Sequence, residues 1–319
     1  MSLLSLCPWL DRRGRVSALR SACLALLCAP AVWMLYLAYT GAFDPEPLKA
    51  ALHESGKWAV RGLLLALAVT PLRWTAWWPE CVVLRRMIGL SALAYAVLHV
   101  ALYVAEQGYK PLTIVSEIAL RFYLTIGFVA FVGMVVLGWT STDAALRRMG
   151  KRWKRLHRLI YPITALALFH HFLQGKIDVT EATLSAGLFL WLMGWRLLPA
   201  ERRANPWVLL AMAPVLALAT AGLEYAWYAL ATRLPADRIA AANLDWAVAP
   251  RPVHWVLLAA LGMVLVAFWR RSALARPAPR SDAGRNEQGR AGNGKIRDRP
   301  AGAPQGRHPL SDRPGPVHG

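Results

Sequence analysis

The chain has 319 residues, of which 56% are hydrophobic and 17% are charged, whereas soluble globular proteins carry about 25% charged residues. This composition argues against a water-soluble enzyme. The 37 Lys and Arg residues exceed the 18 Asp and Glu residues to give a formal net charge of +19, and in a chain with long apolar blocks this excess indicates membrane topology rather than nucleic-acid binding.

Long apolar segments recur along the whole chain. A helix needs about 17–25 apolar residues to cross roughly 30 Å of hydrocarbon. Eight segments of this kind, bounded by Pro, Gly or charged residues, lie near 20–39, 58–78, 87–106, 122–140, 157–174, 182–199, 207–231 and 252–269. The first lacks a small-residue cleavage site followed by a soluble domain, so we expect an anchor rather than a signal peptide. The sequence therefore predicts an all-α integral membrane protein, a bundle of about eight transmembrane helices.

The charges of the loops alternate along the chain. Lys and Arg gather before the first span and after the second, fourth and sixth spans, whereas the intervening loops carry mixed charge. Lys and Arg accumulate in short cytoplasmic loops. This pattern predicts a multi-pass protein with both termini in the cytoplasm.

Four regions follow from these spans: a cytoplasmic N-terminus at 1–19, a six-helix transmembrane domain at 20–200, two additional helices at 201–269 and a tail at 270–319. The tail has 11 basic and 4 acidic residues and almost no bulky apolar side chains, so we expect it to be disordered. Anionic membrane lipid is the partner expected for a basic cytoplasmic tail, in preference to nucleic acid.

Histidines within the spans are the candidate functional residues. His53, His254, His308 and His318 lie in loops or the tail and are interpreted as solvated, whereas His99, His157, His170 and His171 lie within or at the ends of spans. An ionisable side chain in a membrane span is costly without a partner and is a functional candidate by default.

Two of these histidines lie at similar depth. His99 is about seven residues, roughly 10 Å, from the outer end of its span, and His170 is about four residues, roughly 6 Å, from the same surface. Imidazoles at matched depth on neighbouring helices can occupy both axial positions of one haem, which favours electron transfer. Haem b is expected rather than haem c, because the chain has no CxxCH motif. The alternative is a hydrogen-bonded polar side chain between helices.

The neighbouring residue His171 points about 100° away from His170, so only one of the two can face His99. We favour His170, because it follows His157 by close to an integral number of helical turns and the two would project from nearly one face. His171 is the reserve ligand. His157 is interpreted either as the ligand of a second haem, about 20 Å away along the axis, or as one more cationic residue at the interface.

Two arginines, Arg85 and Arg86, lie at the inner end of the third span, level with His157. They are poor iron ligands, but their guanidinium groups could meet haem propionates or a flavin phosphate. No residue is assigned a catalytic acid or base role.

Four segments carry a resemblance to a known family. They are SGKWAVRGLLLALAVTPLR at 55–73, LRRMIGLSALAYAVLHVALY at 84–103, RFYLTIGF at 121–128 and TSTDAALRRMGKRWKRLHRLIYP at 140–162. Together they resemble the MsrQ (YedZ) family, the haem-binding membrane subunits of MsrPQ methionine sulfoxide reductases, within the ferric-reductase-like transmembrane group. The resemblance covers roughly residues 20–200.

The resemblance implies a role, cofactors and partners. It implies a bacterial inner-membrane subunit that passes electrons from the quinone pool to a periplasmic, molybdenum-containing MsrP-like subunit, which reduces methionine sulfoxide in oxidised proteins. By the same resemblance His99, His157 and His170 match the family's intramembrane histidines, and haem b and FMN are the cofactors. The chain departs from the family in having Phe122 where Pro is common, His171 where an aromatic residue is common, and two spans beyond the usual six.

Two other functions stay open at this stage. One is a transmembrane ferric reductase or another haem b oxidoreductase, although the tail is too short and polar for the flavin and nicotinamide domain that such enzymes usually carry. The other is a transporter or scaffold without haem, for which the sequence offers no inverted repeat and no pair of broken spans. The immediate electron donor, quinol or reduced flavin, is not determined by the sequence.

Overall fold

The computed structural model describes Trp9 and residues 15–76, 78–175, 177–243, 245 and 250–275. The chain divides into two units, Met1–Leu274 and Ala275–Gly319, and the first contains the helices discussed below. The described residues contain no strand. The sequence predicts a disordered tail at 270–319, and the residues of this tail from 276 onward lie outside the described part of the chain.

The predicted all-α fold is confirmed, because each of the eight apolar segments falls on a helix. The eight long helices are α1 (Ala18–Tyr39), α2 (Pro47–Thr75), α3 (Arg85–Glu106), α5 (Phe122–Trp139), α8 (Ile160–Gly175), α9 (Thr180–Leu197), α10 (Pro206–Ala231) and α12 (Pro252–Ala275). Five helical stretches among the described residues are both long and apolar enough to cross a membrane: Ala18–Tyr39, Cys81–Glu106, Phe122–Trp139, Pro206–Ala231 and Pro252–Ala273.

Shorter elements connect these helices. They are the 3₁₀ helices η2 (Pro79–Leu84) and η3 (Ala200–Arg202) and the α-helices α4 (Pro111–Leu120), α6 (Asp143–Met149), α7 (Lys151–His157) and α11 (Ala236–Ala242). Proline supplies the first residue of α2, α4, α10 and α12, where its missing N–H is not needed and its fixed φ suits the helix.

Helix α2 is longer than the sequence predicts. It begins at Pro47 rather than near residue 58, so Lys49, Glu54 and Lys57 lie on a helix instead of in a loop. The charges belong to the N-terminal part of this helix, where ion pairs such as Lys57 Nζ to Glu54 Oε2 at 2.6 Å form between successive turns.

The predicted span at 157–174 is interrupted near its start. Helix α7 ends at His157, residues 158–159 form a turn, and α8 begins at Ile160. Pro162 accounts for the break, because proline is tolerated in the first turn of a helix but cannot donate to a carbonyl four residues earlier. His157 and His170 therefore lie on two different helices, and the argument that they project from one helical face is wrong.

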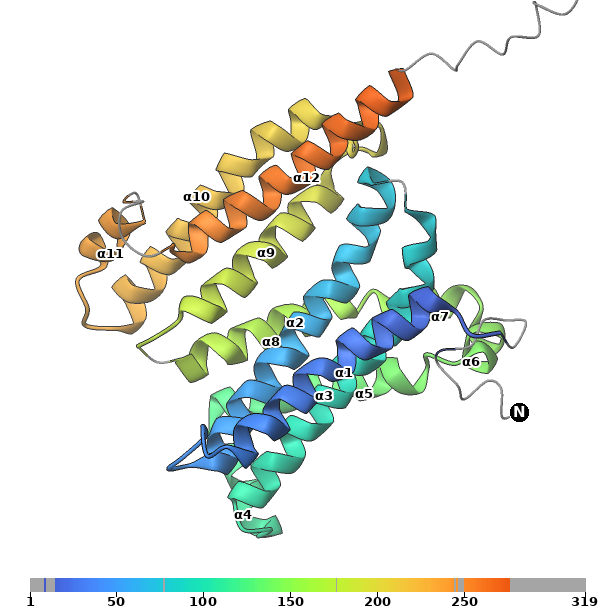
Figure 1. Ribbon diagram of the computed structural model, residues 1–319. Helices are drawn as coiled ribbons and strands as arrows, with labels where there is room; N and C mark the ends of the chain where they lie inside the picture. The colour runs from blue at the N-terminus through green and yellow to red at the C-terminus, as the bar shows by residue number, and fades with distance from the viewer. Residues whose placement is uncertain are drawn as a thin grey trace, which may run out of the picture. The chain divides into compact units, whose positions relative to one another are not determined.

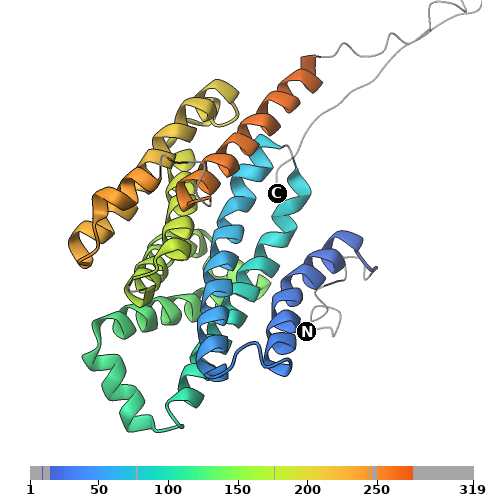
Figure 2. The ribbon, with the colours of Figure 1, turned by 60° about the vertical axis from the view of Figure 1, so that its left-hand side comes forward.

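Helix α2 lies at the centre of the first unit and packs against α3 on one side and α8 and α9 on the other (Figure 1). Helix α5 packs against α8 and α3. Buried side chains from α2, α3, α5 and α8 form one apolar cluster, which includes Leu63, Ala92, Met134 and Ile163. Helix α4, which was not predicted, lies at one end of this four-helix group in both views (Figures 1 and 2).

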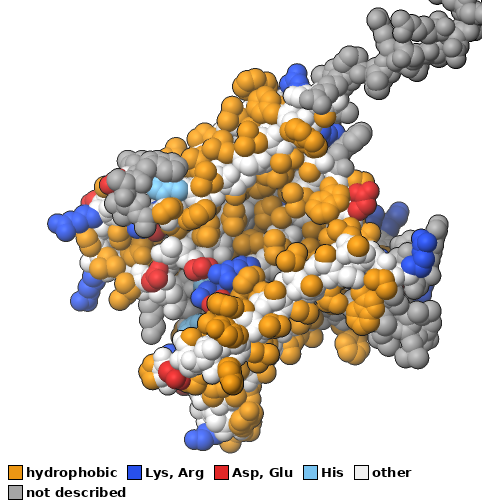
Figure 3. Space-filling view, in the orientation of Figure 1, with side chains coloured by type: hydrophobic (Ala, Val, Ile, Leu, Met, Phe, Trp, Pro, Cys, Tyr) orange, Lys and Arg blue, Asp and Glu red, His pale blue; other side chains and the backbone are white. Residues whose placement is uncertain are grey.

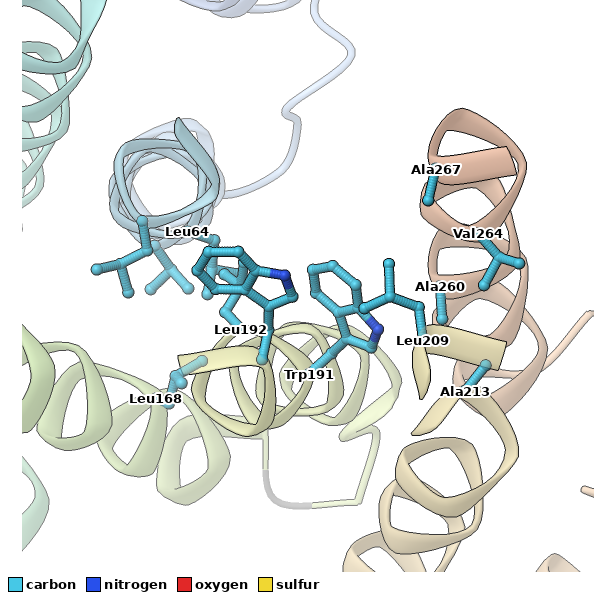
Figure 4. Close-up of a cluster of buried hydrophobic side chains, with 12 residues drawn as sticks. Leu64, Leu168, Trp191, Leu192, Leu209, Ala213, Ala260, Val264 and Ala267 are labelled. Carbon is cyan, nitrogen blue, oxygen red and sulfur yellow. The ribbon is translucent and has the colours of Figure 1, made fainter. Parts of the chain in front are cut away.

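A second apolar cluster attaches the two C-terminal helices. Leu64 of α2 and Leu168 of α8 meet Trp191 and Leu192 of α9, which in turn meet side chains of α10 and α12 (Figure 4). The contributions of α10 and α12 are Leu209, Ala213, Ala260, Val264 and Ala267. The additional helices are therefore packed into the bundle on the side of α9.

The surface of the bundle is predominantly apolar. Hydrophobic side chains cover most of the face in Figure 3, whereas charged side chains lie mainly at its margins, with one group near the centre. Exposed apolar side chains occur along α1, α10 and α12, for example Leu35 at 70%, Leu218 at 64% and Leu265 at 70% exposure. Soluble monomers rarely expose apolar surface of this extent, so these helix faces suit contact with lipid.

A buried carboxylate fixes the C-terminal part of α10. Glu224 is 1% exposed and accepts hydrogen bonds from Arg251 Nη2 at 2.6 Å and from Asn243 Nδ2 at 2.8 Å. Arg251 Nε also donates to Asn243 Oδ1 at 3.1 Å. These bonds join the ends of α10, α11 and α12.

We expect Glu224→Ala to destabilise the protein, because it leaves the Arg251 guanidinium group partly buried without its counter-ion. Removing one partner of a buried pair costs about 3–5 kcal/mol, which should lower the melting temperature in detergent by roughly 10 °C. The matched control is Glu201→Ala on the exposed helix η3. Equal melting temperatures for the two variants would contradict the assignment.

Candidate functional site

The structure brings His99 of α3 and His170 of α8 together. Their ring centroids are 6.3 Å apart and the ring planes are inclined at 82°. Two imidazoles that bind one metal ion from opposite sides would have ring centroids roughly 6 Å apart. This distance is the sum of two metal–nitrogen bonds of about 2 Å each and the distance from each nitrogen to the centroid of its ring. The observed separation therefore suits a shared metal centre between α3 and α8.

Each ring is held by a main-chain carbonyl of a neighbouring helix. His99 Nδ1 lies 2.8 Å from the Leu52 carbonyl oxygen of α2, and His170 Nδ1 lies 2.8 Å from the Tyr123 carbonyl oxygen of α5. A carbonyl oxygen only accepts hydrogen bonds, so Nδ1 carries the proton in both neutral rings and Nε2 keeps its lone pair. Metal-binding histidines are commonly oriented in this way.

A cavity of about 670 Å³ adjoins the two rings. This volume lies within the range of about 300–1,000 Å³ typical of cofactor sites. Its apolar lining residues include Leu63, Phe131 and Met134. Residues of α2, α3, α4, α5 and α8 line it, with none from α9, α10 or α12.

The charged part of the lining, which we call the cavity mouth, contains Lys49, Lys57, Glu106, Glu117 and Arg121, and His53 lines the cavity as well. Each of its three cations pairs with a carboxylate: Lys49 with Glu46, Lys57 with Glu54 and Arg121 with Glu117. The hydrogen bond and charge of Glu46 raise the pKa of Lys49, so this amine stays protonated at physiological pH. The Tyr103 hydroxyl also lines the cavity, is buried and has no hydrogen-bond partner in the described part of the chain. A ligand that carries carboxylates at one end would fit this arrangement.

The reserve ligand His171 lines the same cavity. Its Nδ1 is buried without a hydrogen-bond partner among the described residues, whereas the ring contact with His99 is made by His170. His171 thus differs from His99 and His170, whose Nδ1 atoms each have a carbonyl partner among those residues.

His157 is not a lining residue of this cavity. Its Nε2 lies 3.3 Å from Ser141 Oγ and its Nδ1 lies 3.2 Å from the Trp153 carbonyl oxygen. The ring also stacks on the Trp153 indole with centroids 3.7 Å apart. Both ring nitrogens therefore have polar neighbours in the structure, and the second haem remains a prediction.

Arg85 and Arg86 are also absent from the lining. Arg85 Nη2 donates to Thr70 Oγ1 at 2.7 Å, and Arg86 Nη1 pairs with Asp143 Oδ1 at 2.9 Å. The cations that do surround the cavity mouth belong to α2 and to the junction of α4 and α5.

Sequence reasoning missed several contributors to this site. His53 was interpreted as a solvated loop residue, yet it lines the cavity together with Lys57. The signal that could have found them is the spacing from His53 to Lys57, which places both side chains on one face of a helix. The Leu52 and Tyr123 carbonyls have no such signal, because any residue type supplies a main-chain carbonyl.

Comparison with known proteins identifies relatives over much of the chain. Residues 55–168 match the family of ferric reductase like transmembrane components. The haem-binding subunit MsrQ of protein-methionine-sulfoxide reductase from Xanthomonas axonopodis pv. citri is 39% identical over 166 residues, which are 51% of this chain and 76% of that protein.

Two further relatives bear the same name. The Rhodospirillum rubrum protein is 38% identical over 195 residues, 60% of this chain and 91% of its own length. The Bordetella pertussis protein is 37% identical over 171 residues, 53% of this chain and 83% of its own length. No solved structure matches the chain.

Proposed function

Because the chain belongs to the MsrQ family, we propose that it is a membrane electron-transfer subunit that binds haem b between α3 and α8. It is a multi-pass membrane protein. The observation that carries the proposal is the pair His99 and His170, with centroids 6.3 Å apart and each ring oriented by a carbonyl of another helix.

The protein's own contribution is ligation, orientation and exclusion of water. His99 and His170 would hold the iron through Nε2, and the Leu52 and Tyr123 carbonyls would keep each Nδ1 proton in place. When bound, a haem supplies a one-electron iron couple whose potential depends on its axial ligands and surroundings. The apolar part of the lining, including Leu63 and Met134, would keep water away.

The haem propionates are proposed to meet the cations at the cavity mouth, chiefly Lys57 and Arg121, and the buried Tyr103 hydroxyl. These side chains border the same cavity as the two histidines. Arginine and lysine donors form strong charge-assisted hydrogen bonds with carboxylates.

The direction of electron flow follows from the expected topology. The polar mouth is formed by the N-terminal ends of α2 and α5 and the C-terminal ends of α3 and α8, all of which face loops of mixed charge. By the positive-inside rule these ends face the periplasm, and both termini face the cytoplasm of an inner-membrane protein. We propose a periplasmic, molybdenum-containing MsrP-like acceptor, which would carry out the reduction of methionine sulfoxide.

The donor side is proposed to use the quinone pool or a reduced flavin. If FMN binds, Arg85, Arg86 and the basic segment at 147–158 are the proposed partners of its phosphate, because they form the inner basic surface. A second haem at His157 is proposed in the same region. Neither assignment is needed for the site between His99 and His170.

A transmembrane ferric reductase is the second candidate, favoured by the family match over residues 55–168. That match contains His99 and His157 but ends before His170. Purified protein in detergent, reduced with a quinol analogue, would separate the two functions: a ferric reductase should reduce ferric chelates directly, whereas an electron-transfer subunit should require a catalytic partner to reduce methionine sulfoxide.

We expect His99→Ala and His170→Ala each to abolish the same haem, because each removes one axial ligand. The measurement is haem content per purified polypeptide, with reduced and oxidised absorption spectra. His171→Ala is the matched control, because His171 lines the same cavity but lacks a carbonyl partner, and it should retain the haem. His157→Ala should remove a second haem or none. Full haem content in the His99→Ala protein would refute the ligand assignment.

The propionate assignment predicts weaker haem binding without a change of ligation. Lys57→Met and Arg121→Met should each reduce the affinity of the apoprotein for haem several-fold, while the absorption maxima stay at the wild-type positions. Arg86→Met is the control, because Arg86 is a cation in an ion pair, as Lys57 and Arg121 are, but lies outside the cavity lining. A larger effect of Arg86→Met than of Lys57→Met would move the propionates to the inner end.

A further inference from the structure

Two glycines lie directly against the paired histidines. A Cβ atom added to Gly56 of α2 would stand 2.9 Å from His99 Nδ1 and 3.0 Å from His99 Cε1. A Cβ atom added to Gly127 of α5 would stand 2.7 Å from His170 Nδ1 and 2.8 Å from His170 Cε1. Real Cβ atoms essentially never approach other heavy atoms this closely, so only glycine fits with the rings where they are.

Each glycine also lies one turn beyond the carbonyl that orients the ring. His99 Nδ1 donates to the carbonyl of Leu52, four residues before Gly56, and His170 Nδ1 donates to the carbonyl of Tyr123, four residues before Gly127. In an α-helix the carbonyl of residue i accepts from the N–H of residue i+4. A carbonyl oxygen has a second lone pair that can accept another hydrogen bond. The imidazole reaches this lone pair across the Cα of the glycine, because glycine has no Cβ atom in the way.

We propose that Gly56 and Gly127 are positioning residues that set the orientation of the two axial histidines. The missing side chain lets each imidazole dock against the turn of a neighbouring helix, and the two docking sites together set the 82° angle between the ring planes. This inference rests on the proposed function, since it concerns His99 and His170 as haem ligands.

A glycine can also serve only to let two helices pack closely, without orienting a histidine. Other glycines of the same helix pairs have this role. Between α2 and α3, a Cβ at Gly62 would meet Ala92 Cβ at 2.8 Å; between α5 and α8, a Cβ at Gly133 would meet Ile163 Cδ1 at 2.7 Å. Neither touches a histidine. Gly89 of α3 has nothing within 4 Å of an added Cβ. Each helix pair thus contains one glycine against a histidine and one against an apolar side chain.

The test compares five alanine variants of the full-length protein in detergent: Gly56, Gly127, Gly62, Gly133 and Gly89. We expect Gly56→Ala and Gly127→Ala to weaken haem binding about 10–100-fold, as loss of an orienting partner does at other metal-binding histidines. Electron paramagnetic resonance of the oxidised protein supplies the second readout. Nearly perpendicular axial imidazoles should give a strongly anisotropic low-spin signal, and rotation of one ring should reduce the anisotropy.

The control variants separate orientation from packing. Gly62→Ala and Gly133→Ala should lower the melting temperature but leave the resonance signal of the bound haem unchanged. Gly89→Ala should also leave the signal unchanged and should not lower the melting temperature, because alanine is favoured over glycine within a helix. Wild-type haem affinity and a wild-type signal in Gly56→Ala and Gly127→Ala would overturn the inference.

A double substitution keeps the test decisive if Gly56→Ala folds poorly. If the added Cβ acts through the imidazole, Gly56→Ala should lower the melting temperature much less in a His99→Ala background than in the wild type. An equal loss in both backgrounds would overturn the inference. If His99→Ala and His170→Ala lose the haem while both glycine variants behave as the wild type does, this inference alone is overturned. If the histidine variants retain the haem, the proposed function is overturned.

Discussion

The site depends on one constraint: an imidazole that is to offer Nε2 to a metal needs a polar partner that holds its Nδ1 proton, and few such partners exist among apolar membrane helices. Two main-chain carbonyls, those of Leu52 and Tyr123, meet this need for His99 and His170. A carbonyl that already closes a helical turn can accept a second hydrogen bond. Consequently α2 and α5 support the rings of α3 and α8, and the cavity lies between these two helix pairs.

The same division explains how the bundle accommodates α10 and α12. Helices α10 and α12 pack through Ala213 and Ala260 onto α9, on a cluster that reaches α2 and α8 through Leu64 and Leu168 (Figure 4). They contribute nothing to the cavity lining. Their polar anchor, Glu224 with Arg251, is formed between α10 and the start of α12. Additions on this side can therefore stabilise the bundle without changing the groups around the histidines.

The sequence predicted the helices better than their ends. Apolar length identifies a span, because a helix rises 1.5 Å per residue across a layer of known thickness, and it located all eight long helices. Apolar length did not locate the start of α2, whose first turns carry charged side chains that border the cavity mouth. It also did not show the break before α8 that Pro162 imposes. The matched depth of His99 and His170 was readable from residue counts. Their carbonyl partners were not, because main-chain acceptors leave no trace in residue identity.

The start of α5 determines part of the geometry of the site. Phe122 is the first residue of α5, and Arg121 before it is extended, with φ −100° and ψ 104°. Residues before proline prefer this conformation, and the first helical residue does not use its N–H in the helix. Either residue type can therefore begin α5 at the same point. Tyr123 then lies in the first turn with Gly127 one turn later. The carbonyl and the space that His170 requires therefore depend on where the helix begins.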